Sequence, residues 1–499
     1  MLRTGVLLSL LLSIVASVAP ARAQNFTFAS VQEQARELAA QPYVKPAEIA
    51  SPVLRAVNYD QYLKIRFRPE KAVWHGTRAL FRAEFFPAGF LFNAPVSVSV
   101  VTDGKATPVD SDGLFDVSAA GLKGDPGAMP IAGVRLTFPL HGAKRDEVIS
   151  FLGASYFRIL GRGQAYGASA RALAIDTGLP RPEEFPHFRS FWLVTPPDGS
   201  ADGAREATVW ALVDTPAAAG AFAFTIRPGS RTVTDVSATL FMRHDVSLLG
   251  LAPLTSMYLS GKNGPRRDDF RPEVHDSDGL LMATGGGERL YRPLQNPATL
   301  SVSSFADRNP RGFGLMQRER AFGQYLDIQA NYHARPSLWV EPLGDWGEGQ
   351  VRLLELPTTS EVHDNIAAFW APRTPPRKGE RLDLRYRLVA LSDELQAIGP
   401  ARAVATRTSA LTDRPRHRVL VVEFAGGELE SMGAELDIEA VVSSTTGKIG
   451  ATRVEKPAAG NWRMILELEP AGSSPMDLRG FLRLNGEALT ETWTYLMRP

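Results

Sequence analysis

The fold class is decided by three consecutive segments, Thr208-Val-Trp-Ala-Leu-Val213, Ala221-Phe-Ala-Phe-Thr-Ile226 and Val233-Thr-Asp-Val-Ser-Ala-Thr-Leu240. In each segment, apolar residues return at every second position. A period of two is that of a β-strand, whose successive side chains point to opposite faces. Turn residues separate the segments at strand-like intervals. The three segments therefore predict neighbouring antiparallel strands with one buried face.

The same alternation recurs along most of the chain. The 43 glycines and 36 prolines are scattered, which fits many short strands joined by turns. We therefore predict an all-β protein built around a large antiparallel sandwich. The further alternating segments are Tyr62–Phe67, Val96–Val101, Val134–Phe138, Leu300–Phe305, Val351–Leu356 and Leu382–Leu391.

Few helices are expected. The clearest opens with the capping box Ser30-Val-Gln-Glu33, carries an apolar stripe that includes Val31 and Ala35, and ends before Pro42.

A basic, turn-rich stretch near residues 392–416 predicts a domain boundary. After it, five strand-like segments in about a hundred residues are typical of an immunoglobulin-like sandwich. We expect a signal peptide at 1–23, a β-sandwich domain at 24–395, a linker at 396–415 and an immunoglobulin-like domain at 416–499. The five segments are Val419–Phe424, Ile438–Ser444, Trp462–Leu468, Leu478–Leu484 and Glu491–Leu496.

The N-terminus reads as a secretory signal of the Sec type. Arg3 precedes an apolar run from Val6 to Val18, and Ala21-Arg-Ala23 is a cleavage site. Cleavage removes two arginines and no acidic residue, so the formal net charge moves from +1 to −1. A nearly neutral protein is not expected to bind nucleic acid or a membrane surface by charge. No later apolar run is long enough for a stable membrane anchor.

The chain has no cysteine, which excludes disulfides, thiolate nucleophiles and cysteine-metal sites. His275, Asp276 and Asp278 cluster, but the calcium-loop pattern and the HExxH zinc motif are both absent. We therefore expect no metal and no cofactor. The segment Gly161–Gly167 lacks the spacing of a nucleotide-binding loop and is expected to be a turn at the edge of a cleft.

The segment from Pro272 to Trp370 holds the best candidate site. Asp276 and Asp364 stand among many aromatic residues, and rings with carboxylates are what a neutral, hydroxyl-rich polymer requires. Glycoside hydrolysis needs one carboxylic acid to protonate the leaving oxygen and a second carboxylate to activate water or attack the sugar.

A structural reading competes with this one, and from composition alone it is the stronger. Asp276 and Asp278 would form Asx-turns, and Asp364 would cap a short helix at 365–370. Trp339 and Trp370 would belong to the core. If Leu338 and Val340 face the core, however, Trp339 faces the other side of its strand, where a cleft would lie.

The chain resembles a known family, the periplasmic glucans biosynthesis proteins G and D of Gram-negative bacteria. The likeness covers nearly the whole mature chain, and the signal is similar to that of the G member. The segments that carry it are 151–158 (FLGASYFR), 161–171 (GRGQAYGASAR), 271–280 (RPEVHDSDGL), 292–297 (RPLQNP), 309–315 (NPRGFGL), 335–342 (RPSLWVEP) and 363–370 (HDNIAAFW).

The resemblance implies a fold and a role. The fold is a galactose-mutarotase-like β-sandwich followed by an immunoglobulin-like domain. The role is in making osmoregulated periplasmic glucans, whose backbone is β-1,2-linked glucose, in the periplasm and alongside an inner-membrane glucosyltransferase. Family members are similar to inverting endo-β-1,2-glucanases, and some transfer the chain instead of hydrolysing it.

The resemblance also implies roles for single residues. Asp276 matches the family's base, Asp364 its acid, and Tyr332 a tyrosine of the proton path, while Glu361 matches an acidic neighbour. These matches favour the enzymatic reading over the structural one. We further expect sugar contacts from Tyr166, Tyr291, Tyr332, Trp339 and Trp370, and polar contacts from Arg292 and Arg335.

Two other functions remain open from sequence. The protein could bind nascent glucan without cutting it, or it could be a structural partner of the glucosyltransferase. A carrier would use the same cleft, whereas a structural partner predicts no groove lined by aromatic residues.

Overall fold

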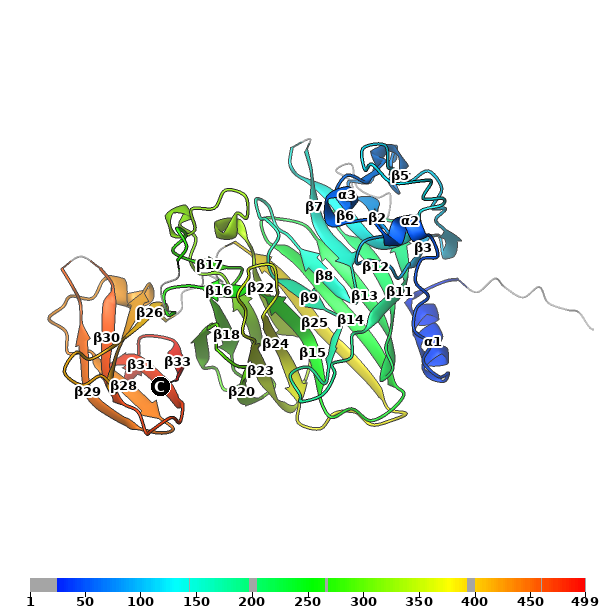
Figure 1. Cartoon of the computed structure of the whole chain (residues 1–499). Helices are drawn as coiled ribbons and strands as arrows, with labels where there is room; N and C mark the ends of the chain where they lie inside the picture. Colours follow the sequence, from blue (N-terminus) through cyan, green and yellow to red (C-terminus); the bar gives the residue numbers. More distant parts are fainter. Residues whose placement is uncertain are drawn as a thin grey trace, which may run out of the picture.

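The computed structural model describes residues 25–142, 144–196, 204–264, 268–392, 400–458 and 460–498. The expected signal peptide at 1–23 lies outside these ranges. Strands dominate the described residues, as the alternating sequence predicts (Figure 1). The helices are α1 (Phe28–Ala39), α2 (Pro52–Arg55) and α3 (Tyr59–Tyr62), with the 3-10 turns η1 (Pro69–Lys71), η2 (Phe322–Gln324), η3 (Tyr332–Ala334) and η4 (Gly427–Glu430).

Two large sheets form the body of the molecule. The first has ten strands, which run in the order β2-β6-β7-β8-β9-β15-β24-β23-β20, with β10 paired to β15. Its strands are β2 (Arg82–Pro87), β6 (Ile131–His141), β7 (Lys144–Leu152), β8 (Tyr156–Ile159), β9 (Ser169–Arg171), β10 (Leu173–Ile175), β15 (Leu249–Ser256), β20 (Ser301–Arg308), β23 (Glu348–Glu355) and β24 (Ile366–Pro372).

The second sheet has fifteen strands. Their order is β28-β31-β33-β19-β18-β21-β22-β25-β14-β13-β12-β11-β3-β4, with β32 paired to β31. The strands are β3 (Ser97–Thr102), β4 (Lys105–Pro108), β11 (His187–Val194), β12 (Ala207–Asp214), β13 (Ala218–Arg227), β14 (Thr232–Met242), β18 (Gly279–Ala283), β19 (Arg289–Pro293), β21 (Gly312–Met316), β22 (Ser337–Pro342), β25 (Arg381–Leu391), β28 (Glu439–Ser444), β31 (Met476–Leu484), β32 (Glu487–Ala488) and β33 (Thr492–Met497).

Three smaller sheets complete the described structure. They are β26-β27-β30-β29, β16-β17 and β1-β5, with bounds β26 (Arg402–Ala410), β27 (Arg418–Ala425), β29 (Lys448–Glu455), β30 (Trp462–Glu469), β16 (Tyr258–Ser260), β17 (Val274–His275), β1 (Arg66–Phe67) and β5 (Phe115–Asp116).

The two large sheets enclose the main core. Phe224 of β13 meets Phe151 of β7 with ring centroids 4.9 Å apart, and it meets Phe157 of β8 at 5.1 Å. All three rings are fully or almost fully buried, and each contributes roughly 1.5–3 kcal/mol by leaving water. Phe224 occupies one of the alternate buried positions of β13 that the strand period selects.

The other face of the β11–β14 region is covered by helix α1. Val31 and Ala35 of the helix are fully buried in a cluster with Trp192 and Leu212. The helix begins three residues earlier than expected, with Thr27 as its N-cap in place of Ser30, and the backbone N–H of Thr27 donates to the Ser30 hydroxyl. Ser30 therefore closes the capping box from inside the helix instead of opening it.

The segment 62–67 is not the strand that its alternation predicts. Asn58 and Gln61 exchange side-chain and backbone hydrogen bonds of 3.0 and 3.2 Å, which start helix α3 just before it. Only Arg66–Phe67 pair as β1. Local capping chemistry here prevails over the period of the side chains.

The C-terminal strands share the fifteen-stranded sheet with the rest of the protein. Parallel pairing of β19 with β33 aligns Leu290 with Thr492 and Tyr291 with Trp493. Strand β26 occupies 402–410, within the stretch expected to be a linker. Figure 1 shows this C-terminal part, coloured orange to red, at one end of the main sandwich.

Candidate functional site

Asp276 directly follows strand β17, which pairs with β16 through Tyr258 and His275. The backbone N–H of Asp276 donates to the carbonyl of Met257 at 2.8 Å, so the pairing extends past the strand end. The side chain is buried, and the Arg335 guanidinium donates to its Oδ1. Asp276 is thus held by its backbone on one side and by an arginine on the other.

Asp364 stands two residues before strand β24, which occupies the place where the alternative reading expected a helix. The carboxamide of the next residue, buried Asn365, accepts from the Tyr258 N–H at 2.8 Å and donates to the Tyr258 carbonyl at 3.0 Å. The loop of Asp364 is therefore fixed to β16, the strand that pairs with the segment of Asp276. Two residues 88 positions apart are brought to one place by this contact.

The two carboxyl groups share one electrostatic environment. Burial raises the pKa of Asp276 to about 6, Arg335 opposes this rise, and the charge of Asp364 adds to it. Loss of hydration also raises the pKa of Asp364, while Arg158 and Arg335 lower it. The Asp364 side chain is exposed, so water can reach its carboxyl group. The protein packed around it nevertheless hydrates the carboxylate less well than bulk water does.

Tyr332 and Arg335 complete the immediate surroundings of Asp276. Tyr332 begins η3, and the Arg335 guanidinium lies over its ring at 4.2 Å from the centroid. The carbonyl of Ala330 accepts from Arg335 Nε at 3.1 Å and from Nη2 at 3.0 Å, which fixes the guanidinium plane. Burial raises the pKa of Tyr332, so its phenol stays protonated at neutral pH.

Glu361 belongs to a second charged cluster beside this group. Arg271 pairs with Asp269 at 2.9 Å, with Asp327 at 3.0 Å and with Glu361 at 2.7 Å. The arginine thereby ties together three loops that flank Asp276. Glu361 also lies close enough to act on the pKa of Tyr332.

A polar strip on the outer face of the ten-stranded sheet extends from Asp364. We define it by Tyr156, Arg158, Arg171, Ser169 and Thr255. Strand pairing places Tyr156 opposite Arg171 and Ser169 opposite Thr255. Phe157, which lies between Tyr156 and Arg158 in the chain, faces the core. Arg158 and Tyr156 both interact electrostatically with Asp364. Ser169, Thr255 and Arg171 are buried within the strip, whereas Tyr156 and Arg158 are partly exposed beside Asp364.

Tyr166 joins this strip from the glycine-rich loop. Its hydroxyl donates to Glu147, its ring lies 5.9 Å from the Arg158 guanidinium carbon, and it is 45% exposed. Gly163 has a φ of +74° and makes the turn, and Gly167 packs against Arg335, where a Cβ would come within 2.8 Å of the arginine Cβ. The segment 161–167 is therefore a loop at the edge of the candidate site.

Sequence reasoning did not select Tyr156 and Arg158 as site residues. A signal was present, since Phe157 is apolar and its two neighbours are polar, so both neighbours must leave the core together. Which elements cover that outer face depends on pairing between strands far apart in sequence.

Four expected site residues lie elsewhere, which corrects the predicted platform. Trp370 is fully buried in the main core, and Trp339 is 4% exposed in the C-terminal core. Trp339 does face away from Leu338 and Val340, but the C-terminal strands cover that side. Tyr291 lies in the same C-terminal core, whereas Arg292 is on the other face of strand β19, where it pairs with Asp477 at 2.7 Å and lies over the Phe305 ring.

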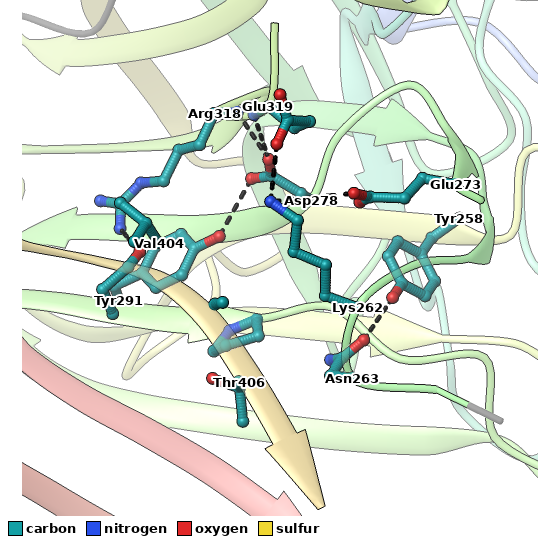
Figure 2. A pocket seen from close by; sticks show the side chains of 13 residues that line it. Tyr258, Lys262, Asn263, Glu273, Asp278, Tyr291, Arg318, Glu319, Val404 and Thr406 are labelled. Atoms are coloured by element: carbon teal, nitrogen blue, oxygen red, sulfur yellow. Dashed lines mark hydrogen bonds and ion pairs between the residues drawn. The ribbon is translucent and has the colours of Figure 1, made fainter. Parts of the chain in front are cut away.

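Figure 2 shows the surroundings of Asp278, on the side of the segment 276–278 that faces the C-terminal strands. Asp278 accepts from the Tyr291 hydroxyl at 3.0 Å and from the backbone N–H groups of Arg318 and Glu319 at 2.6 and 2.9 Å. Asp276 and Asp278 thus occupy opposite sides of one segment. Asp276 faces Arg335, and Asp278 faces a small cavity of about 40 Å³ that Thr406 of β26 also lines.

Comparison with known proteins identifies close relatives of nearly full length. The sequence pattern described as "Periplasmic glucan biosynthesis protein, MdoG" matches residues 26–497. Glucans biosynthesis protein G of Ralstonia nicotianae is 43% identical, over 98% of this chain and 99% of the relative. Glucans biosynthesis protein G of Rhodopseudomonas palustris is 45% identical, over 94% and 93%. A probable glucans biosynthesis protein D of Shewanella oneidensis is 39% identical, over 100% and 94%.

Within the part of the chain that the structure describes, no helix combines the length and the apolar character needed to cross a bilayer.

Proposed function

Because the chain belongs to the MdoG family of periplasmic glucan biosynthesis proteins, we propose that it acts on the glucan as an enzyme. The reaction is inverting, internal cleavage of β-1,2-glucan, or transfer of the cleaved chain to another glucan. The observation that supports this most is the placement of Asp276 and Asp364 in one charged environment with Arg335. In the inverting reaction, one carboxyl group must be protonated while the other is ionised.

Asp364 is the general acid in this proposal. It is reachable by solvent, so the glycosidic oxygen of a bound chain can approach it. Its raised pKa favours the protonated form that the leaving group requires. Arg158 and Arg335 then stabilise the carboxylate that remains after proton transfer.

Asp276 is the general base. Its burial protects the carboxylate from bulk water, and its ion pair with Arg335 keeps the charge in place. Tyr332, whose ring lies against the same guanidinium, relays the proton: its hydroxyl accepts a proton from the attacking water and passes its own to Asp276. Oxygen of the water then bonds to the anomeric carbon, and the leaving oxygen takes the proton of Asp364.

The polar strip supplies the contacts for the rest of the glucan. Tyr166 and Tyr156 offer ring faces to sugars, while Arg158 offers guanidinium donors to hydroxyl groups. Arg171 is buried beneath them, where it pairs with Glu183 at 2.7 Å and lies 5.2 Å from the centre of the Tyr156 ring. The aromatic contacts thus come from tyrosines of the strip in place of Trp339 and Trp370.

The finer architecture belongs to the same proposal. We assign 24–395 to a galactose-mutarotase-like sandwich and 416–499 to an immunoglobulin-like domain, with β26 as part of their connection. Location in the periplasm, delivery by a cleaved signal at 1–23 and work alongside an inner-membrane glucosyltransferase follow from the family role.

The test is incubation of the purified protein with linear β-1,2-glucan, followed by measurement of new reducing ends. We expect turnover by the natural protein and at least a thousand-fold loss in Asp276→Asn and in Asp364→Asn, with glucan binding retained. Unchanged turnover in either variant would remove that residue from its role. Retention of glucan without any cleavage would instead indicate a carrier.

A further inference from the structure

Gln317 joins the two segments that carry Asp276 and Tyr332. This buried residue follows β21, and its Nε2 donates to the carbonyl of His275 at 2.9 Å and to the carbonyl of Tyr332 at 3.1 Å. Its backbone N–H donates to the Ser337 hydroxyl at 2.9 Å. One side chain therefore sets the spacing between the base and the tyrosine that the proposed relay needs.

The same glutamine determines where the protons of His275 lie. Because Nε2 of Gln317 is used for two donations, its Oε1 is the acceptor that faces His275 Nδ1 at 2.8 Å. His275 Nδ1 must then carry a hydrogen. The other ring nitrogen, Nε2, lies 2.9 Å from Oε2 of Glu273, so a second proton is shared between the ring and that carboxyl group.

The surroundings favour placing this second proton on the ring. Burial would lower the pKa of His275, but the hydrogen bond and charge of Glu273 raise it above its ordinary value. The ring is fully buried, stacked on Tyr258 at 5.4 Å and in edge contact with Tyr325. Glu273 forms an ion pair with His275, and the imidazolium sits next to Asp276 in the chain.

The other charges near His275 are consistent with this assignment. Asp278 also acts to raise the pKa of His275. Lys262 approaches Glu273 at 3.8 Å and Glu319 at 2.6 Å, so its ammonium group lies on the far side of Glu273 from His275 (Figure 2). The positive charge of His275 in turn lowers the pKa of Asp276 against the effect of burial.

We propose that Gln317 and the Glu273–His275 ion pair are positioning residues that hold Asp276 beside Tyr332 and keep Asp276 ionised. They touch neither the substrate nor the reacting atoms. Their effect is exerted through the backbone of His275 and Tyr332 and through the charge of the imidazolium. This assignment rests on the proposed function in one respect, because an ionised Asp276 matters for catalysis only if Asp276 is the general base.

The test uses the whole protein and does not depend on turnover. Carboxyl-¹³C aspartate labelling, with Asp276→Asn to identify the resonance, measures the titration midpoint of Asp276. Glu273→Gln should neutralise His275 and raise this midpoint by about half to one pH unit. In the pH dependence of kcat, the acid limb should move by the same amount in the same direction.

Glu319→Gln is the matched control, because Glu319 is the other carboxylate that pairs with Lys262 and it does not contact His275. It should leave the Asp276 midpoint in place. Equal midpoints in Glu273→Gln and the natural protein would overturn the proposal, even if turnover is normal. Absence of turnover with a shifted midpoint would count against the proposed function and not against the ion pair.

A measurement on the natural protein covers the case in which Glu273→Gln does not fold. In ¹⁵N-histidine spectra followed over pH, one of the eight rings should stay doubly protonated to a higher pH than an ordinary histidine does. Spectra in which no ring titrates above the ordinary range would refute the ion pair directly.

Discussion

At the scale of single residues, Asp276 carries an energetic cost that the site requires. The residue is 4% exposed, and its pKa is raised to about 6 although Arg335 is bonded to it. A buried carboxylate of this kind is retained in proteins mainly where its chemistry is used. Two consequences can be measured, one in activity and one in stability.

The activity should depend on pH in a direction set by these carboxyl groups. Asp276 must be ionised to act as base, so kcat should fall tenfold per unit as the pH drops below about 6. Asp364 must be protonated, and its raised pKa extends activity upward before the alkaline limb begins. A pH profile of kcat on β-1,2-glucan tests this. A rate that stays level down to pH 4 would contradict the assignment of the base.

The stability of Asp276→Asn should also depend on pH. A folded-state pKa of about 6, above the unfolded value of 3.8, means that the natural protein loses stability as the pH rises through this window. Asparagine does not ionise, so the variant does not lose stability in this pH window. We expect the variant to be more stable by up to about 3 kcal/mol at pH 7.5 and little changed at pH 4.

Urea unfolding at the two pH values measures this difference. Asp278→Asn is a suitable control, because its carboxylate accepts two backbone N–H groups and a tyrosine hydroxyl. That variant should be destabilised. An Asp276→Asn variant that is less stable at pH 7.5 than at pH 4, relative to the natural protein, would contradict the stated cost.

At the scale of elements, the glycine-rich loop and η3 form one contact. Ala165 N–H donates to the Ala334 carbonyl at 3.0 Å, and Gly167 leaves no room for a Cβ beside Arg335. Gly167→Ala should displace Arg335 and lower kcat/KM by ten- to a hundred-fold, because small shifts at a reacting group are costly. The folded state should persist.

Gly323→Ala is the matched control for this loop. It lies in η2, also near the site, with ordinary φ and no heavy atom within 4 Å of the added methyl group. Steady-state kinetics of both variants decide the point. If Gly167→Ala works as well as Gly323→Ala, Arg335 does not depend on the loop as we describe.

The elements also show what alternation can and cannot predict. Strands β12, β13 and β14 appear where the period of two places them, because every second side chain enters the same core. Asp276 and Asp364 could be named as candidates from the sequence, but only the family resemblance favours the enzymatic reading of them over the structural one. Their common neighbourhood arises from Asn365, which bonds to a strand more than a hundred positions away.

Trp339 illustrates the limit most clearly. Its alternation with Leu338 and Val340 correctly predicts that it faces the other side of the sheet, but alternation does not say what covers that side. Strands from 400–498 cover it, so the expected sugar platform is part of a core. Tyr291 is hidden for the same reason.

At the scale of the whole molecule, the C-terminal part should unfold together with the rest. The fifteen-stranded sheet crosses the junction, and the buried pair between Arg318 and Glu491 spans it with contacts of 2.5 and 2.9 Å. Glu491→Ala leaves Arg318 without this partner and should cost roughly 3–5 kcal/mol. Calorimetry should show one transition that moves as a whole.

Glu348→Ala controls for the loss of an ion pair as such. Its partner is the exposed Arg373, and the transition temperature should stay where it is. A separate transition of the C-terminal part, shifted alone by Glu491→Ala, would contradict the shared sheet as the unit of folding.

The central claim is that Asp364 and Asp276 act as an acid–base pair on the glucan with inversion at the anomeric carbon. Proton NMR of the first products from linear β-1,2-glucan tests it most directly. The account predicts new reducing ends that are α at first and equilibrate later. New ends that are β at first, or glucan that stays uncut after prolonged incubation, would contradict it.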